Sequence, residues 1–149
     1  MSGKWKTTEQ AAMARRLLRS VDSGILSTMS MEIPGYPFGS LTPYAMTHEG
    51  RVAVYVSEIA QHTRNMRGDP KVCLTVTEGS GTENQQALGR VTVVGDAREV
   101  PADLKVVVGE RYFSLFPEAR EYAGTHDFLF YWVEPRRVRY IGGFGRIFW

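Results

Sequence analysis

SEIAQHTRNMRGDP, residues 57–70, separates two runs with the composition of buried strands, RVAVYV at 51–56 and KVCLTV at 71–76. This connection concentrates hydroxyl, amide, imidazole and guanidinium groups, at Ser57, His62, Thr63, Arg64, Asn65 and Arg67. Such groups at the start of a helix suit an oxyanion, most often a phosphate. The same segment would also form an ordinary capped helix of one or two turns with a solvated face. The flanking sequence has to separate these two interpretations.

Outward from this segment, the sequence predicts short strands joined mostly by hairpins. Strands are expected at 25–31, 38–47, 51–56, 72–77, 87–100, 128–133 and 138–141. Pro43 predicts an edge position or a bulge, and Gly95 a bulge or bend. Helices are expected at 7–21, at 102–116 and again from Pro117. Six or seven short strands with peripheral helices predict a mainly β fold, a small antiparallel barrel.

Length and composition narrow the class of protein. A chain of 149 residues predicts one domain over 1–149. A formal charge of +2 with scattered basic residues gives no reason to expect nucleic acid as a partner. No apolar run approaches the roughly 18 residues of a membrane span, and the N-terminus has no apolar core of a secretory signal. The single cysteine, Cys73, lies in an apolar alternation typical of a core residue in a reducing cytoplasm.

Familiar catalytic motifs are missing from the sequence. It contains no G-x-S-x-G elbow, no phosphate loop and no cysteine pair for zinc. His48, His62 and His126 have no short metal-ligand spacing, so no metal site is expected. Three segments instead carry hydroxyl groups, at 39–44, 57–65 and 89–92, and the last two of them also contain an arginine. A flat heterocycle with a phosphate tail would need such a set, although ordinary strand polarity would also produce each segment.

The order of these motifs resembles the pyridoxamine-phosphate-oxidase-like FMN-binding split barrels, and more narrowly their haem-utilisation branch. The matching segments are Gly24–Thr28, Gly35–Ser40, His62–Asn65, Asp69–Pro70, Arg90–Thr92, Asp127–Phe128 and Gly142–Gly145. They extend over nearly the whole chain from Gly24 onward. The resemblance implies a homodimer of split barrels with FMN bound at the subunit interface.

The resemblance also implies a role for particular residues. In that family's pattern the FMN phosphate and ribityl chain would be held by Ser57, His62, Thr63, Arg64 and Asn65. The isoalloxazine edge would lie along Gly39, Ser40, Leu41 and Thr42, and Arg90 would reach the ring from below or from the partner subunit. Phe144, Phe148 or Trp149 of the terminal segment would cover the flavin from the other chain. His62 would serve as a neutral donor to the phosphate or as a residue that fixes the loop.

Two hypotheses of different classes follow. The first is a cytoplasmic FMN-binding flavoprotein, an oxidoreductase whose substrate the sequence does not indicate, with no residue marked as catalytic. The alternative is a non-enzymatic flavin- or haem-binding module, or a haem-degrading protein. Two differences from the family's sequence pattern bear on the choice between these hypotheses. No arginine–histidine pair follows the last strand, which argues against vitamin B6 oxidation, and no histidine follows His126 to hold a haem iron.

Overall fold

The computed structural model describes residues 2–79, 84–124, 127–143 and 146–149, with side chains described from residue 9 onward. Within these residues eight strands form one antiparallel sheet: β1 (Ser23–Met29), β2 (Pro37–Pro43), β3 (Ala45–Met46), β4 (Val52–Ser57), β5 (Lys71–Thr77), β6 (Arg90–Glu99), β7 (Phe128–Ile141) and β8 (Ile147–Phe148). Their order is β2-β1-β5-β6-β7-β4-β3, with β8 paired to β7. The predicted mainly β, antiparallel split barrel is confirmed.

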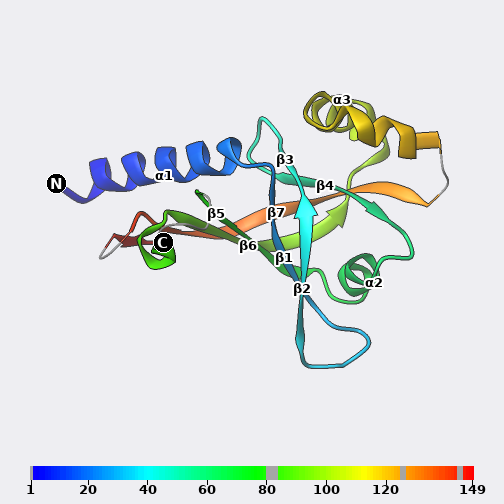
Figure 1. The fold of residues 1–149 in the computed structure, drawn as a ribbon, viewed down its shortest axis with the longest axis horizontal. Helices are drawn as coiled ribbons and strands as arrows, with labels where there is room; N and C mark the ends of the chain where they lie inside the picture. Colours follow the sequence, from blue (N-terminus) through cyan, green and yellow to red (C-terminus); the bar gives the residue numbers. More distant parts are fainter. Residues whose placement is uncertain (1, 80–83, 125–126, 144–145) are drawn as a thin grey trace.

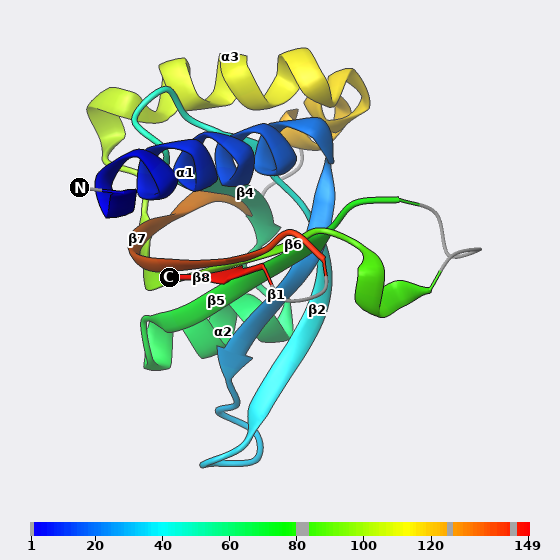
Figure 2. The ribbon, with the colours of Figure 1, turned by 90° about the vertical axis from the view of Figure 1, so that its left-hand side faces the viewer.

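Three α-helices surround the curled sheet: α1 (Ser2–Ser20), α2 (Gln61–Gly68) and α3 (Lys105–Leu115). Helices α1 and α3 lie on one side of the barrel, whereas α2 lies at its opposite end, beside the β1–β2 hairpin (Figures 1 and 2). Short 3-10 turns occur at Gln85–Ala87, Ala102–Leu104 and Pro117–Gly124. No helix in the described part of the chain is long and apolar enough to cross a membrane.

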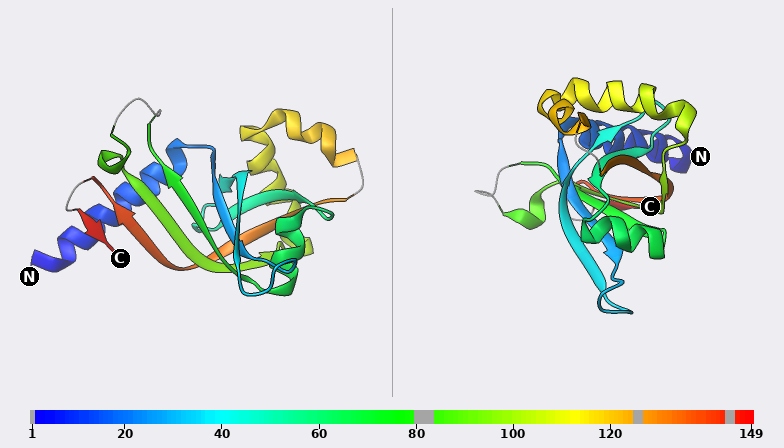
Figure 3. Two further views of the ribbon diagram at one scale, coloured as in Figure 1. Left: turned by 60° about the horizontal axis from the view of Figure 1, so that its bottom comes forward. Right: turned by 90° about the vertical axis from the view of Figure 1, so that its right-hand side faces the viewer.

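The core fills the inside of the curl, because alternate residues of each strand point inward. Leu26, Val54, Leu74 and Val91 are each fully buried there. A second apolar cluster, which includes Phe130 and Trp132, lies between α3 and the outer side of β4 and β7. Figure 3 shows the curl from two further directions, with β7 running under α3 at one end and pairing with β8 at the other.

A bulge explains where the strand prediction was wrong. Two strands, 128–133 and 138–141, were expected, but β7 runs without interruption from Phe128 to Ile141. The register with β6 shifts between Val94 and Gly95, so that Gly95 faces Pro135 and Arg136 is the extra residue. A Cβ at Gly95 would collide with the carbonyl oxygen of Glu134. The predicted irregularity at Gly95 is confirmed, and it lets β7 accommodate a proline that has no N–H to donate.

Pro43 ends β2, which is the edge strand of the sheet, so its predicted edge position is confirmed. The expected strand 38–47 is therefore divided into β2 and β3 at Tyr44. The Tyr44 backbone N–H donates to the carbonyl of Asp22 at 3.0 Å, and its hydroxyl donates to the carbonyl of Leu18 at 2.5 Å. These bonds attach the β2–β3 junction to the end of α1.

Candidate functional site

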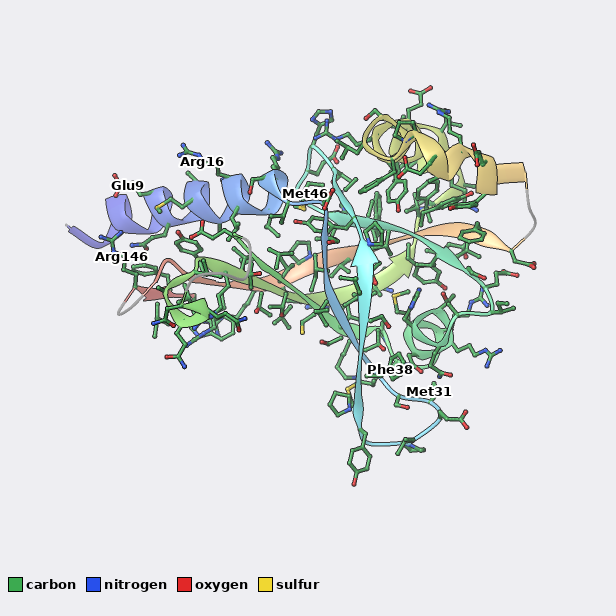
Figure 4. The ribbon with its side chains drawn as sticks, in the orientation of Figure 1. Glu9, Arg16, Met31, Phe38, Met46 and Arg146 are labelled. Atoms are coloured by element: carbon green, nitrogen blue, oxygen red, sulfur yellow. The ribbon has the colours of Figure 1, made fainter. Side chains whose placement is uncertain are left out.

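Helix α2, the segment expected to hold a phosphate, is attached to the barrel by buried side chains. Thr63 is fully buried, and its hydroxyl donates to the carbonyl of Ser57 at 2.6 Å. Asn65 is also fully buried: its amide donates to the Thr28 hydroxyl at 2.9 Å. The carbonyl oxygen of the same side chain accepts from the Met31 backbone N–H and from the Gln61 amide, both at 2.9 Å. In this structure Thr63 attaches α2 to the end of β4, and Asn65 positions α2 against the β1–β2 hairpin, whose Met31 and Phe38 are labelled in Figure 4.

Three other residues of the predicted phosphate group are accessible. Arg64 is exposed, and Ser57 and His62 are half-buried. Burial lowers the pKa of His62 below its ordinary value, which favours the neutral imidazole at neutral pH. The residue that caps α2, Ala60, supplies no side-chain hydrogen bond to the helix. The first turn of α2 therefore carries backbone N–H groups, an exposed guanidinium and a half-buried neutral imidazole.

Strand alternation divides the residues that were expected along the flavin edge. Gly39 and Leu41 pair with Ser27 and Ile25 of β1 and share their outward-facing side of the sheet. Leu41 is 74% exposed. Ser40 and Thr42 are less exposed, and the buried Thr42 hydroxyl donates back to the Ser40 carbonyl at 3.2 Å. Only Gly39 and Leu41 of this group face the outer surface.

That outer surface continues across five strands, and we call it the open face. Cross-strand partners place its side chains in two adjoining rows: Leu41, Ile25, Thr75, Thr92 and Arg139 in one, and Gly39, Ser27, Cys73, Val94 and Arg137 in the other. Each of these residues is at least partly exposed. The Thr75 and Thr92 hydroxyls lie 3.1 Å apart, as expected for neighbours on one side of a sheet. The open face combines apolar, hydroxyl and arginine side chains.

A cavity of about 740 Å³ lies at the end of the open face nearest the end of α1. Ile25, Leu41 and Thr75 line it from the sheet, and Arg19 and Asp22 line it from the α1–β1 junction. Its volume falls in the range of about 300–1,000 Å³ common for sites of small molecules and cofactors. Ile25 and Leu41 are 45% and 74% exposed, so the cavity presents apolar surface beside a guanidinium.

Arg90 lies at the cavity end of the sheet, away from α2. It is paired with Thr77, which lines the cavity, whereas Lys71 at the other end of β5 follows α2 almost directly. Thr77 lies six positions along the extended strand from Lys71, which corresponds to about 20 Å. The structure thus brings Leu41 and Arg90 to the cavity end and Ser57, His62 and Arg64 to the other end.

The terminal segment packs on the arginines of the open face. The guanidinium groups of Arg137 and Arg139 lie 4.5 Å and 5.0 Å from the centre of the Trp149 ring, which is 56% exposed. Phe148 stacks on Tyr140 with ring centres 6.5 Å apart. Phe144, the third residue expected to cover a ligand, lies outside the described residues.

Arg19, Ile25 and Thr75 line the cavity although no motif in the sequence marks them as members of a site. In β1 the inward positions include polar Thr28, and the outward positions include apolar Ile25, so hydrophobic alternation does not show which side is open. Thr28 is buried because Asn65 supplies it with a partner from α2. Arg19 lies on a helix whose apolar spacing indicated only a solvated arginine. An exposed isoleucine opposite an exposed leucine is visible only once the strands are paired.

Comparison with known proteins agrees with this architecture. A family model described as "CREG, beta-barrel" matches residues 6–148. A chloroplastic non-canonical haem oxygenase of Arabidopsis thaliana is 33% identical over 134 residues, which are 90% of this chain and 40% of that protein. A haem oxygenase of Vibrio cholerae, HutZ, is 25% identical over 131 residues, 83% of this chain and 72% of that protein. The chain thus spans less than half the length of the Arabidopsis protein.

Among solved structures, a haem-binding protein from Mycobacterium smegmatis superposes with a TM-score of 0.85 at 29% identity. The superposition covers 93% of this chain and 56% of that one. The described strands and the matched family model therefore indicate the same barrel.

Proposed function

The chain belongs to the CREG β-barrel family, and we propose that it binds haem in the cavity at the end of the open face. The observation that carries this proposal is the combination of 740 Å³ of space with exposed Ile25 and Leu41 beside arginine. Three similar proteins are named as haem oxygenases or as a haem-binding protein, which is why haem takes precedence over other flat ligands.

The cavity fits the two chemical parts of a porphyrin. Ile25 and Leu41 would contact the apolar macrocycle, because their exposed side chains lie together on one side of the sheet. Arg19, and Arg90 beside Thr77, would pair with the propionate groups. Asp22 also lines the cavity and favours a position of the propionates away from its own carboxylate. When bound, haem supplies oxygen and redox chemistry that none of these side chains can supply.

The cavity supplies no strong iron ligand from its described lining. None of the lining residues that the structure describes is histidine, cysteine or methionine. Tyr44 lines the cavity, but its hydroxyl donates to the Leu18 carbonyl, and burial raises its pKa, so a phenolate is disfavoured. The protein would therefore hold haem mainly by macrocycle packing and propionate pairing, and an iron ligand would have to come from outside this lining.

We also propose that the open face pairs with a second copy of the chain. Leu41, Ile25 and Val94 expose apolar surface on it at 74%, 45% and 38%. Leu41 and Ile25 are neighbours on β2 and β1, and exposed apolar surface of this kind marks an interaction site on many proteins. A second copy would cover the cavity from the other side and could contribute the missing iron ligand. The homodimer was expected from the resemblance and stays a proposal.

Titration of the purified protein with haem, followed by its Soret absorption, tests the ligand. Leu41→Asp should weaken haem binding by roughly tenfold or more, because it puts a carboxylate where the macrocycle needs apolar surface. Ile59→Asp is the matched control, since Ile59 is similarly exposed at 70% but lies outside the cavity lining. Equal haem affinity in the two variants, or no binding by the native chain, would refute the site.

Addition of a reductant to the haem-loaded protein in the presence of dioxygen then distinguishes two outcomes. Loss of the Soret band with release of iron would identify a haem-degrading enzyme. A stable spectrum would identify a haem-binding module. Light scattering of the native chain and of Leu41→Asp reports whether the open face forms the dimer, independently of either spectrum.

A flavin is the second candidate, because the first turn of α2 keeps accessible donors for a phosphate. Ser57, His62 and Arg64 are each at least partly exposed there, and the helix has no side-chain cap. In this alternative FMN would extend from α2 along Gly39 and Leu41, and the protein would be an oxidoreductase. Titration with FMN, followed by flavin fluorescence, tests it directly. Arg64→Ala should weaken FMN binding and leave haem binding unchanged if the two ligands use different ends of β2.

A further inference from the structure

Two arginines on the open face share a single aromatic partner. Arg137 and Arg139 lie two positions apart on β7, about 7 Å along the strand, so their side chains leave the sheet on the same side. Their guanidinium groups lie 4.5 Å and 5.0 Å from the centre of the Trp149 ring. The register of β7 with β8, which pairs Tyr140 with Phe148, brings Trp149 level with Arg139. We call these three side chains the arginine–tryptophan cluster.

The arginine–tryptophan cluster is separate from the cavity proposed for haem. Ile25 of that cavity and Arg139 stand in the same row of the open face, but on β1 and β7, which are three strand spacings or about 14 Å apart. None of the three cluster residues lines the cavity. Figure 3 shows β8, beside the cluster, at the end of β7 opposite to α3. A ligand of the cluster would therefore occupy its own site.

The charge of this arginine pair is not offset by a carboxylate. Arg136, the preceding residue of β7, donates to the Asp96 carboxylate. Arg137 and Arg139 form no ion pair within the described part of the chain. Among the described side chains of the two open-face rows, none is aspartate or glutamate. The two guanidinium groups therefore repel each other, and an anion that pairs with both would be attracted without competition from a neighbouring carboxylate.

The exposed surface of the cluster indicates which anion fits. Arg137 is exposed, Arg139 is half-buried, and Trp149 is 56% exposed. Ile147, two positions before Trp149 on the same side of the extended chain, is 52% exposed and adds apolar surface. Two arginine forks match the oxygens and the double charge of a phosphate monoester, and an indole with an apolar neighbour matches a flat aromatic ring. The cluster thus combines partners for a phosphate and for a ring.

We propose that the arginine–tryptophan cluster binds a nucleoside monophosphate. The phosphate oxygens accept hydrogen bonds from Arg137 and Arg139, and the base lies against Trp149 and Ile147. Since every base has an aromatic face that an indole can contact, the site selects for the phosphate and not for one particular base. The site does not depend on haem, because it shares no residue with the haem cavity, so each of the two proposals can fail without the other.

Titration of the haem-free full chain with AMP, followed by calorimetry and by nuclear magnetic resonance of the ¹⁵N-labelled indoles, tests the site. The chain has three tryptophans, and Trp149→Phe identifies the indole resonance of Trp149, which AMP should shift in a saturable manner. Arg137→Gln and Arg139→Gln should each weaken AMP binding by roughly tenfold or more, because each removes a charge-assisted hydrogen bond. Arg137→Lys should restore part of the affinity, since it keeps the charge without the planar fork. Adenosine, which lacks the phosphate, should bind at least roughly tenfold more weakly than AMP.

Arg136→Gln is the matched control variant. Arg136 is also an exposed arginine of β7, but its guanidinium already pairs with Asp96. Its AMP affinity should stay within about twofold of that of the native chain, because solvent screens exposed charges that make no direct contact. A Trp149 resonance that does not respond to AMP would overturn the site, as would equal AMP affinity in Arg137→Gln and Arg136→Gln. Adenosine that binds as tightly as AMP would overturn the role of the arginines, and inorganic phosphate that binds as tightly as AMP would overturn the assignment to a nucleotide.

Discussion

Replacing Asn65 by alanine should destabilise the protein strongly, although the residue was first identified as part of a phosphate site. The side chain is fully buried and makes three hydrogen bonds of 2.9 Å, to Thr28, Met31 and Gln61. Two of these cross from α2 to the β1–β2 hairpin. The substitution removes all three and leaves the Met31 backbone N–H and the buried Thr28 hydroxyl without this partner.

The expected loss can be worked from these contacts. Each hydrogen bond contributes about 1 kcal/mol net, and each group left buried without a partner costs about 1–3 kcal/mol. Since Gln61 can turn to solvent and the Thr28 hydroxyl can rotate, we expect a total of about 3 kcal/mol rather than the full sum. With a urea m-value of about 2 kcal/mol/M, the unfolding midpoint should fall by about 1.5 M.

Urea unfolding followed by circular dichroism measures this loss. Arg64→Ala is the control, because Arg64 is the exposed neighbour on the same helix and its loss should change stability by less than about 0.5 kcal/mol. Thr28→Val combined with Asn65→Ala completes a double-mutant cycle, in which the pair should show coupling of about 1 kcal/mol. A loss under about 1 kcal/mol for Asn65→Ala, or no coupling to Thr28, would refute the positioning role.

Two further predictions concern the bulge and the histidine. In urea unfolding, Gly95→Val should destabilise the protein by about 3 kcal/mol or more, because the new Cβ would collide with the Glu134 carbonyl. Gly39→Ala lies on the exposed edge strand and should change stability little. Burial lowers the pKa of His62 in the folded state, so the unfolded chain binds a proton at a higher pH than the folded chain does. The free energy of unfolding should therefore fall as the pH drops below about 6.5. His62→Gln should reduce that fall between about pH 7.5 and 5.5. An identical pH dependence in His62→Gln and the native chain would exclude His62 as its source.

Much of the fold could be predicted because it follows from local chemistry. The irregularity at Gly95 and the edge position of Pro43 are properties of single residues, and the structure has both. The continuity of β7 could not be predicted, because it depends on Gly95 lying opposite Pro135, a pairing of residues forty positions apart. Pro135 alone indicates a break in a strand. It is tolerated because β7 itself bulges at this level, with Arg136 as the extra residue opposite Val94 and Gly95 of β6.

The candidate site was only partly predictable for a related reason. Leu41 and Arg90 were identified, but the sequence could not show that they lie at the opposite end of the barrel from Arg64. Arg19 and Ile25 join the cavity through the packing of α1 beside β1, which no local pattern encodes. The chemistry of a residue is visible in the sequence, whereas its neighbours across the sheet are not.

The two ends of β2 now give a physical basis for choosing between haem and flavin. A flavin phosphate at α2 would rely on a helix whose most polar buried side chains, Thr63 and Asn65, already bond to the chain itself. Only Arg64, His62 and Ser57 remain there, so most of the phosphate charge would be met by one exposed guanidinium, which solvent screens strongly. At the cavity end, the apolar side chains Ile25 and Leu41 gain from burial by a macrocycle, and the arginines need only pair with its edge. A macrocycle would cover more of this apolar surface than a flavin phosphate at α2, which is why we propose haem rather than flavin as the ligand.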